Sequence, residues 1–167
     1  MPRTARARPT PKRRGPKRKR LLRVLVLSGP NLDRLGRREP DIYGRLTLAE
    51  IHELVSARAA ELGATAVCRQ SNHEGDLVGW IGTAEEDGFV GLLLNPGALT
   101  HTSYALYDAL RGASVPAVEV HLSNPDAREP FRRRSRVAPA CVGRVAGFGA
   151  ESYLLALQGL LAHLASR

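Results

Sequence analysis

The sequence predicts an α/β fold in which a parallel β-sheet is covered by helices on both faces. Short apolar runs alternate along the chain with longer segments that have helical periodicity. The runs are almost uninterrupted by polar residues, which is typical of strands that are buried on both faces. Strands that alternate with helices in this way form parallel sheets.

Five apolar runs are predicted to be strands. The first, at residues 23–27 (RVLVL), ends at Ser28-Gly29-Pro30, where glycine and proline favour a turn. The other four predicted strands are residues 65–68, 89–94, 117–120 and the weaker run 141–145.

Four segments are predicted to be α-helices, and the first has a clear start. Thr47 and Glu50 have the spacing of a capping box, and Gly63 follows as a stop signal. The helices are residues 47–62, 74–86, 102–110 and 150–165, with a short helix at 128–134. The side chains expected to face the sheet are Leu48, Ile51, Leu54, Val55, Leu62, Leu77, Trp80, Ile81, Ala84, Tyr153, Leu154, Leu157, Leu160, Leu161 and Leu164.

This succession of strands and helices predicts a doubly wound, flavodoxin-like sheet with strand order 2-1-3-4-5. We expect one domain at residues 23–167. Right-handed crossovers place the carboxyl ends of all strands at one edge of the sheet, where ligands bind in folds of this kind.

Residues 1–22 form a basic extension that we expect to be disordered. Ten of the 25 Lys and Arg residues lie in it, which leaves 15 basic and 16 acidic residues in the predicted domain. Like charges repel, and the extension has little apolar surface to bury. We favour an unselected or solubilising extension, or a misassigned start, over a tether for nucleic acid.

Three further features limit the class of protein. Cys68 and Cys141 lack metal-ligand spacing and fit a reducing cytosol, so we expect a cytoplasmic protein. No apolar run approaches the ~20 residues of a membrane-spanning helix, so no membrane partner is expected. The turn after the first strand does not match a nucleotide-binding loop, and the histidines lack HExxH spacing.

Polar side chains follow three of the predicted strands, so they should converge at one edge of the sheet. They are Asn31 after the first strand, Asn95 and His101 after the third, and Glu119, His121, Ser123 and Asn124 at the fourth.

The loop at residues 36–44 carries a phenol and two arginines between Gly36 and Gly44. A guanidinium close to Tyr43 would favour tyrosinate and make it a usable base near neutral pH. The two glycines would let the loop act as a lid. In the alternative interpretation, Tyr43 packs on the domain and the arginines Arg37 and Arg38 are solvated.

The histidines also allow two interpretations each. His121 could be an acid oriented by Glu119 or a hydrogen-bonded structural histidine. His101 could bind an anion or cap a helix. His52 is predicted to be exposed, and the pair His73 and Glu74 to cap a helix or contact another subunit. Of the arginines at 128–136, one or two could clamp a carboxylate.

Six blocks of the sequence resemble the type II 3-dehydroquinate dehydratases. The blocks are SGPNLDRLGRREPDIYG (28–44), QSNHEG (70–75), LNPGALTHTSYAL (94–106), VEVHLSN (118–124), AREPFRRRS (127–135) and GFGAESYLLAL (147–157). The resemblance spans residues 23–165 and implies a flavodoxin-like fold and a homododecamer built as a tetramer of trimers.

The resemblance also implies a reaction that needs no cofactor and no metal. Tyr43 would take a proton from C2 of 3-dehydroquinate, with Arg38 holding it as tyrosinate, and an enolate would form. His121, oriented by Glu119, would protonate the departing hydroxyl to give 3-dehydroshikimate, and Asn31 would hold a water at the enolate. The residues that would position the substrate are Asn95, His101, Leu122, Ser123, Arg132 and Arg128, with Asp108 from a neighbouring subunit.

Two positions depart from the family pattern, and two other functions compete. Ser28 stands where the family usually has Asn, and Arg136 where an aromatic residue is common.

One competing function is an inactive domain that binds nucleic acid through the basic extension, although aromatic residues make up only 5% of the chain. The other is a nucleotide or flavin protein, although no phosphate-binding loop is present.

Overall fold

The computed structural model describes residues 21–37 and 45–167 of the chain. Its five strands form one parallel sheet in the order β2-β1-β3-β4-β5, which confirms the predicted fold class and strand order. The strands are β1 (Leu22–Ser28), β2 (Ala64–Gln70), β3 (Gly91–Asn95), β4 (Ala117–His121) and β5 (Gly143–Ala146). Most of the basic extension, residues 1–20, lies outside the described residues, and its disorder stays a prediction.

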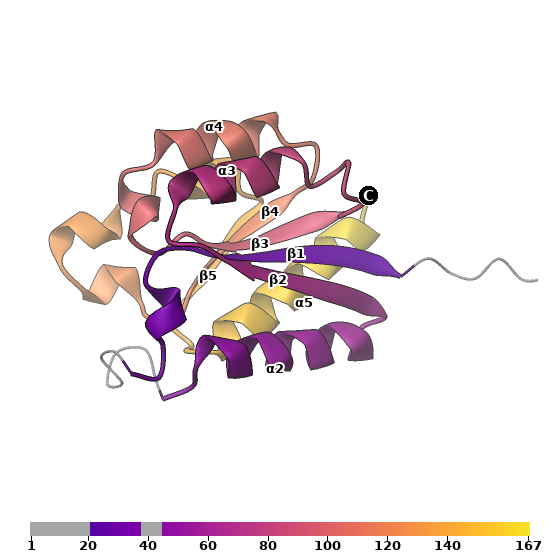
Figure 1. The fold of residues 1–167 in the computed structure, drawn as a ribbon, viewed down its shortest axis with the longest axis horizontal. Helices are drawn as coiled ribbons and strands as arrows, with labels where there is room; N and C mark the ends of the chain where they lie inside the picture. Colours follow the sequence, from indigo (N-terminus) through magenta and orange to yellow (C-terminus); the bar gives the residue numbers. More distant parts are fainter. Residues whose placement is uncertain (1–20, 38–44) are drawn as a thin grey trace, which may run out of the picture.

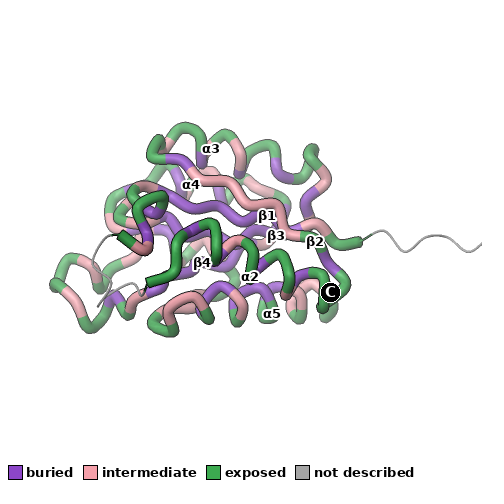
Figure 2. Tube along the Cα trace, turned by 60° about the horizontal axis from the view of Figure 1, so that its bottom comes forward, coloured by how far each residue is buried: buried purple, intermediate pink, exposed green. Residues whose placement is uncertain are grey.

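Among the described residues, four α-helices cover the sheet, two on each face (Figure 1). The first pair, α2 (Leu48–Glu61) and α5 (Glu151–Ala165), packs against Val24 and Val26 of β1. The second pair, α3 (Glu74–Gly82) and α4 (Tyr104–Gly112), packs against Leu25 and Leu27 of the same strand. Successive residues of a strand point to opposite faces, so the near-continuous apolar run supplies both cores. Figure 2 shows that β1 is largely buried.

The start of α2 has the predicted capping box. The Thr47 side chain accepts a hydrogen bond from the Glu50 amide at 3.3 Å, and the Glu50 carboxylate accepts one from the Thr47 amide at 2.7 Å. Each bond satisfies a backbone N–H that has no partner within the helix.

Some details of the helices differ from the predictions. Leu54 and Leu62 were predicted to face the sheet but are 43% and 37% exposed. Leu54 lies beside the buried stripe of α2, and Leu62 follows the last helical residue. Helix α3 ends at Gly82 rather than at residue 86, in a segment where glycines weaken helical structure.

Within the predicted short helix at 128–134 the structure has a 3-10 helix, η4 (Pro130–Arg133), and another 3-10 helix, η3 (Pro125–Ala127), precedes it. Pro130 cannot donate a backbone hydrogen bond and would clash inside a continuous α-helix. Together with η2 (Gly97–His101), these short elements cover the carboxyl edge of the sheet at β3 and β4.

Candidate active site

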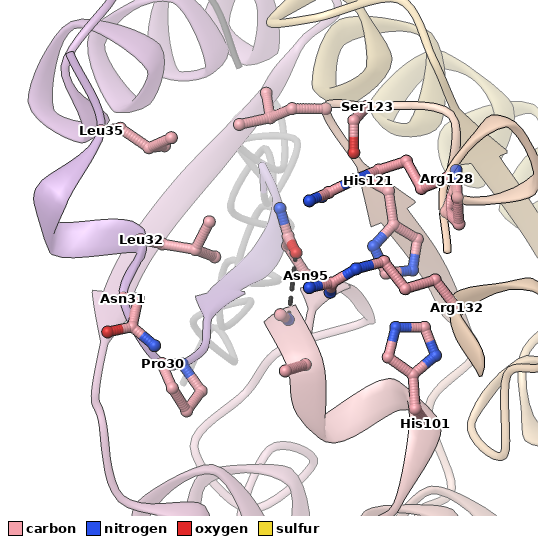
Figure 3. Close-up of a pocket in the computed structure, with 14 residues that line it drawn as sticks. Pro30, Asn31, Leu32, Leu35, Asn95, His101, His121, Ser123, Arg128 and Arg132 are labelled. Carbon is pink, nitrogen blue, oxygen red and sulfur yellow. Dashed lines mark hydrogen bonds between the residues drawn. The ribbon is translucent and has the colours of Figure 1, made fainter. Parts of the chain in front are cut away.

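A cavity of about 120 Å³ opens at the carboxyl edge of the sheet, beyond the ends of β1, β3 and β4. Pro30, Asn31, Leu32 and Leu35 line one side of it, and His101, His121, Ser123, Arg128 and Arg132 line the other (Figure 3). Asn95 lies between the two sides. The predicted site residues that line the cavity are therefore Asn31, Asn95, His101, His121, Leu122, Ser123, Arg128 and Arg132.

The loops after β1 and β3 pack against each other so closely that only glycine fits at two positions. A Cβ atom at Gly29 would lie 2.7 Å from the carbonyl oxygen of Pro96. A Cβ atom at Gly97, where φ is +57°, would lie 2.9 Å from the carbonyl oxygen of Pro30. The Gly29 amide donates to the Asn95 carbonyl at 2.8 Å. The two loops therefore form one continuous wall of the cavity.

Asn31 follows this wall in a left-handed conformation with φ of 66°. Asparagine tolerates this region better than most residues. Its backbone amide donates to the side-chain oxygen of Asn72 at 2.8 Å, which ties the loop after β1 to the loop after β2.

His121 and Glu119, both on β4, form a buried pair. The Nε2 atom of His121 lies 2.6 Å from the Oε1 atom of Glu119. The Glu119 carboxylate also accepts hydrogen bonds from Thr100 at 2.5 Å and from Ser135 at 2.9 Å. Because Nε2 faces Glu119, Nδ1 is the ring nitrogen of His121 that is left for a ligand.

The Glu119 carboxyl group is fully buried, and its pKa is nevertheless lowered, which favours the carboxylate. Burial opposes ionisation, but the hydrogen bond and charge of His121, with the hydroxyls of Thr100 and Ser135, together hold the pKa of Glu119 below its usual value. A buried carboxylate with these donors can orient the imidazole and stabilise its protonated form.

His101 and the arginines of η4 form the basic side of the cavity. The Nδ1 atom of His101 lies 2.9 Å from the backbone carbonyl of Arg134. A carbonyl can only accept, so Nδ1 carries the hydrogen, and Nε2 of the neutral ring is an acceptor. The Arg132 Nε atom donates to Glu129 at 2.8 Å, and the Arg128 Nε atom lies 3.5 Å from the same carboxylate.

Some predicted site residues are not brought to the cavity by the described structure. Tyr43 and Arg38, the predicted base and its arginine, lie outside the described residues, as does most of the predicted lid. Asp108 is exposed on α4 and does not line the cavity. Glu119 lies behind His121 and reaches the cavity only through it.

His52 was predicted to be exposed, and this prediction is wrong. Its ring is partly buried against β1, with Nε2 lying 3.4 Å from Ser28 Oγ, and burial lowers its pKa. The amphipathic pattern of α2 places His52 at the border of the buried stripe, where the pattern alone does not decide exposure. His73, by contrast, is exposed and provides no side-chain cap to α3.

Three polar side chains behind the cavity were missed by the sequence analysis. Ser135 and Thr100 contact Glu119, and Tyr153 contacts Asn95 through its hydroxyl. Tyr153 was predicted as an apolar core residue, and its ring is fully buried. The sequence did contain one indication of this contact: Tyr153 places a hydroxyl at a position that faces the core, and a buried hydroxyl needs a hydrogen-bond partner.

The described residues lack a membrane-spanning helix and a cluster of metal ligands. None of the helices in residues 21–37 and 45–167 has the length and apolar character to span a bilayer. The same residues contain no group of three or more His, Cys, Asp and Glu side chains that could hold a metal ion.

Comparison with known proteins gives a consistent result. Residues 22–161 match the family model described as dehydroquinase class II. The chain is 59% identical over 134 residues to the 3-dehydroquinate dehydratase of Thermus thermophilus, covering 80% of this chain and 90% of that protein. It is 53% identical over 137 residues to the 3-dehydroquinate dehydratase of Deinococcus radiodurans, covering 82% and 96%.

Solved structures agree with these sequence matches. The type II dehydroquinase of Butyrivibrio crossotus is similar with a TM-score of 0.83 and 39% identity, covering 84% of this chain and 98% of that one. The type II dehydroquinase of Propionibacterium acnes is similar with a TM-score of 0.80 and 42% identity, covering 84% and 96%.

Proposed function

Because the chain belongs to the dehydroquinase class II family and is a hydro-lyase that dehydrates 3-dehydroquinate in the shikimate pathway, we propose that the cavity at the carboxyl edge of the sheet is the active site. The observation that carries this proposal is the buried pair of His121 and Glu119. It supplies an oriented imidazole on the wall of a cavity that also presents Asn95, Arg128 and Arg132.

The reaction is a stepwise elimination with an acid and a base. Tyr43, held as tyrosinate by Arg38, takes the proton from C2 of the substrate, and the electron pair moves onto the carbonyl oxygen to give an enolate. When the enolate collapses, the C1–O bond breaks, and His121 gives its proton to the departing hydroxyl, which leaves as water. The product is the conjugated enone 3-dehydroshikimate.

His121 suits the role of acid because of the charge behind it. The Glu119 carboxylate, 2.6 Å from Nε2, orients the ring toward the cavity, as a general acid requires. Thr100 and Ser135 keep that carboxylate ionised and aimed at Nε2. The proton is therefore delivered from Nδ1, on the other side of the ring.

The remaining cavity residues bind the substrate and stabilise charge. Asn31 holds a water at the enolate oxygen, where preorganised donors contribute most. Guanidinium groups pair well with carboxylates, and Arg132 and Arg128 are the cations that line the cavity in the described residues. The side chains of Asn95, His101 and Ser123 and the backbone at Leu122 position the hydroxyls and the carboxylate.

The assembly and location of the enzyme belong to the same proposal. We propose a cytoplasmic homododecamer, a tetramer of trimers, in which Asp108 approaches the active site of a neighbouring subunit. The exposure of Asp108 on α4, away from the cavity of its own subunit, is consistent with this role. The basic extension is a solubilising or unselected segment rather than a nucleic-acid tether.

An absorbance assay tests the proposed site. The purified full chain should convert 3-dehydroquinate to a product with the ultraviolet absorbance of a conjugated enone. The Tyr43→Phe variant should bind the substrate and not turn it over, because it lacks the phenol that ionises. Turnover by Tyr43→Phe at the wild-type rate would remove the assigned base and with it the proposed mechanism.

A further inference from the structure

The hydroxyl group of Tyr153 lies directly behind the wall of the cavity. Tyr153 belongs to α5 and is 0% exposed, whereas Asn95 at the end of β3 lines the cavity and is 3% exposed. The Asn95 Nδ2 atom donates a hydrogen bond to the Tyr153 hydroxyl at 3.0 Å. A side chain from the far helix layer therefore contacts a residue that faces the ligand.

The hydrogen bonds of Asn95 fix the orientation of its amide. The Gly97 backbone amide donates to Asn95 Oδ1 at 3.2 Å, and an N–H group can only donate. The oxygen end is therefore held by Gly97, and the nitrogen end faces Tyr153. One N–H of the amide and one lone pair of its oxygen remain for a ligand.

The Tyr153 hydroxyl has a second partner on β1. It accepts from Asn95 and shares a hydrogen bond with Ser28 Oγ, 3.4 Å away, in which either oxygen can be the donor. Ser28 Oγ also lies 3.4 Å from His52 Nε2 on α2. A chain of hydrogen bonds thus runs from the cavity through α5 and β1 to α2. Burial raises the pKa of Tyr153 to about 12, so the phenol remains a neutral hydroxyl that accepts and donates.

We propose that Tyr153 is a positioning residue for the dehydration, whose hydroxyl holds the Asn95 amide in the one orientation that presents both an N–H donor and a lone pair to the substrate. The inference rests on the proposed function, in which Asn95 binds the substrate. A preorganised amide loses less freedom when the substrate binds, and a flipped amide would exchange its donor for its acceptor. The expected effect of losing the hydroxyl is weaker substrate binding rather than failed proton transfer.

A double-mutant cycle tests the proposal on the full chain. Tyr153→Phe keeps the ring and removes only the oxygen, and Asn95→Ala removes the amide that the oxygen is proposed to hold. Tyr153→Phe should lower kcat/KM by about 3- to 10-fold, the range of one net hydrogen bond, mainly through KM. In the Asn95→Ala background, the same change should cause no further loss, because residues that act through one contact are not additive.

The possible outcomes separate this inference from the proposed function. If the two single losses multiply in the double variant, Tyr153 does not act through Asn95 and the inference is overturned. If Asn95→Ala keeps the wild-type kcat/KM, the assignment of Asn95 as a substrate ligand fails, and the inference fails with it. If the fall for Tyr153→Phe lies in kcat alone, a positioning role in binding is wrong.

Ser152 provides a matched control, and Ser28 a second probe. Ser152 is also 0% exposed on α5, but its hydroxyl accepts from the Phe148 amide at 3.0 Å rather than contacting Asn95. Ser152→Ala should lower the melting temperature and leave KM unchanged. Ser28→Ala removes the second hydrogen-bond partner of the Tyr153 hydroxyl and leaves the bond to Asn95, so it should raise KM less than Tyr153→Phe. If Tyr153→Phe does not fold, an unchanged KM in Ser28→Ala would overturn the proposal.

Discussion

The Nε2 atom of His121 lies 2.6 Å from the Oε1 atom of Glu119, and the same carboxylate is surrounded by the hydroxyls of Thr100 and Ser135. The pair is neither a surface salt bridge nor an isolated buried charge. It is an ionised carboxylate with several donors, and one of these donors is the ring that faces the cavity.

Loss of the acid should reduce turnover more than loss of the carboxylate behind it. His121→Ala should lower kcat by about 10²- to 10⁴-fold, the usual contribution of a general acid. Glu119→Gln keeps the size of the side chain and removes its charge, so a smaller loss, also in kcat, is expected. Steady-state assays of enone formation measure both. Full turnover by His121→Ala would contradict the assigned role.

The charge of Glu119 should also appear in the pH dependence of stability. The folded-state pKa of Glu119 lies below its ordinary value of 4.5. A depressed carboxyl pKa contributes stability above the unfolded pKa, and that stability is lost as the pH falls through the folded pKa. The difference in unfolding free energy between the wild type and Glu119→Gln should therefore shrink below about pH 4.5. Urea denaturation at several pH values measures this difference, and one that stays constant would contradict the prediction.

Ser135 should stabilise the fold as well as the carboxylate. Its hydroxyl accepts from the amides of Val137 at 3.1 Å and Ala138 at 2.8 Å while it donates to Glu119. Ser135→Ala should lower the unfolding free energy by about 1–3 kcal/mol, because these groups lose a partner in a partly buried site. The control is Ser166→Ala at the exposed end of α5, where a change within about 0.5 kcal/mol is expected. Urea denaturation measures both unfolding free energies. Equal losses for Ser135→Ala and Ser166→Ala would contradict the prediction that the hydrogen bonds of Ser135 stabilise the fold.

A methyl group at Gly29 should disrupt the wall formed by the loops after β1 and β3. The added Cβ atom would lie 2.7 Å from the Pro96 carbonyl oxygen. The atoms around it are backbone atoms of Asn95 and Pro96, which cannot move aside as a flexible side chain could. Gly29→Ala should therefore lower the melting temperature and kcat/KM together. Gly159→Ala is the matched control, because nothing lies within 4 Å of a Cβ atom at Gly159 in the middle of α5. That change should stabilise the protein by about 0.5–1 kcal/mol. A melting temperature for Gly29→Ala at or above that of the wild type would contradict the prediction.

The fold could be predicted because each strand and helix carries its own signal. The run at 23–27 is apolar at every position but the first, and such a run fits only a strand buried on both faces. The capping box of Thr47 and Glu50 marks the start of α2 within a few residues. Strand order followed from the number of units and the handedness of their connections.

The residues at the ends of the strands could be predicted for the same reason. Asn95 and His121 come from separate segments, and parallel topology alone brings them to one edge. The contacts behind them could not be predicted. Tyr153 meets Asn95 across 58 positions of sequence, and Ser135 meets Glu119 across 16. Such contacts depend on the exact position and rotation of each helix against the sheet, which the sequence pattern does not specify. For the same reason, the amphipathic pattern of α2 predicted the exposure of His52 wrongly.

The reciprocal packing of Gly29 on Pro96 and of Gly97 on Pro30 has a consequence for redesign of the enzyme. Both loops are already at the closest approach that their backbones permit, so the part of the wall formed by the Gly29–Pro96 and Gly97–Pro30 contacts cannot be reshaped one residue at a time. An enzyme for a bulkier hydroxy acid should instead be sought through smaller side chains at Leu32 and Leu35, which line the cavity from β1's side without being part of that contact.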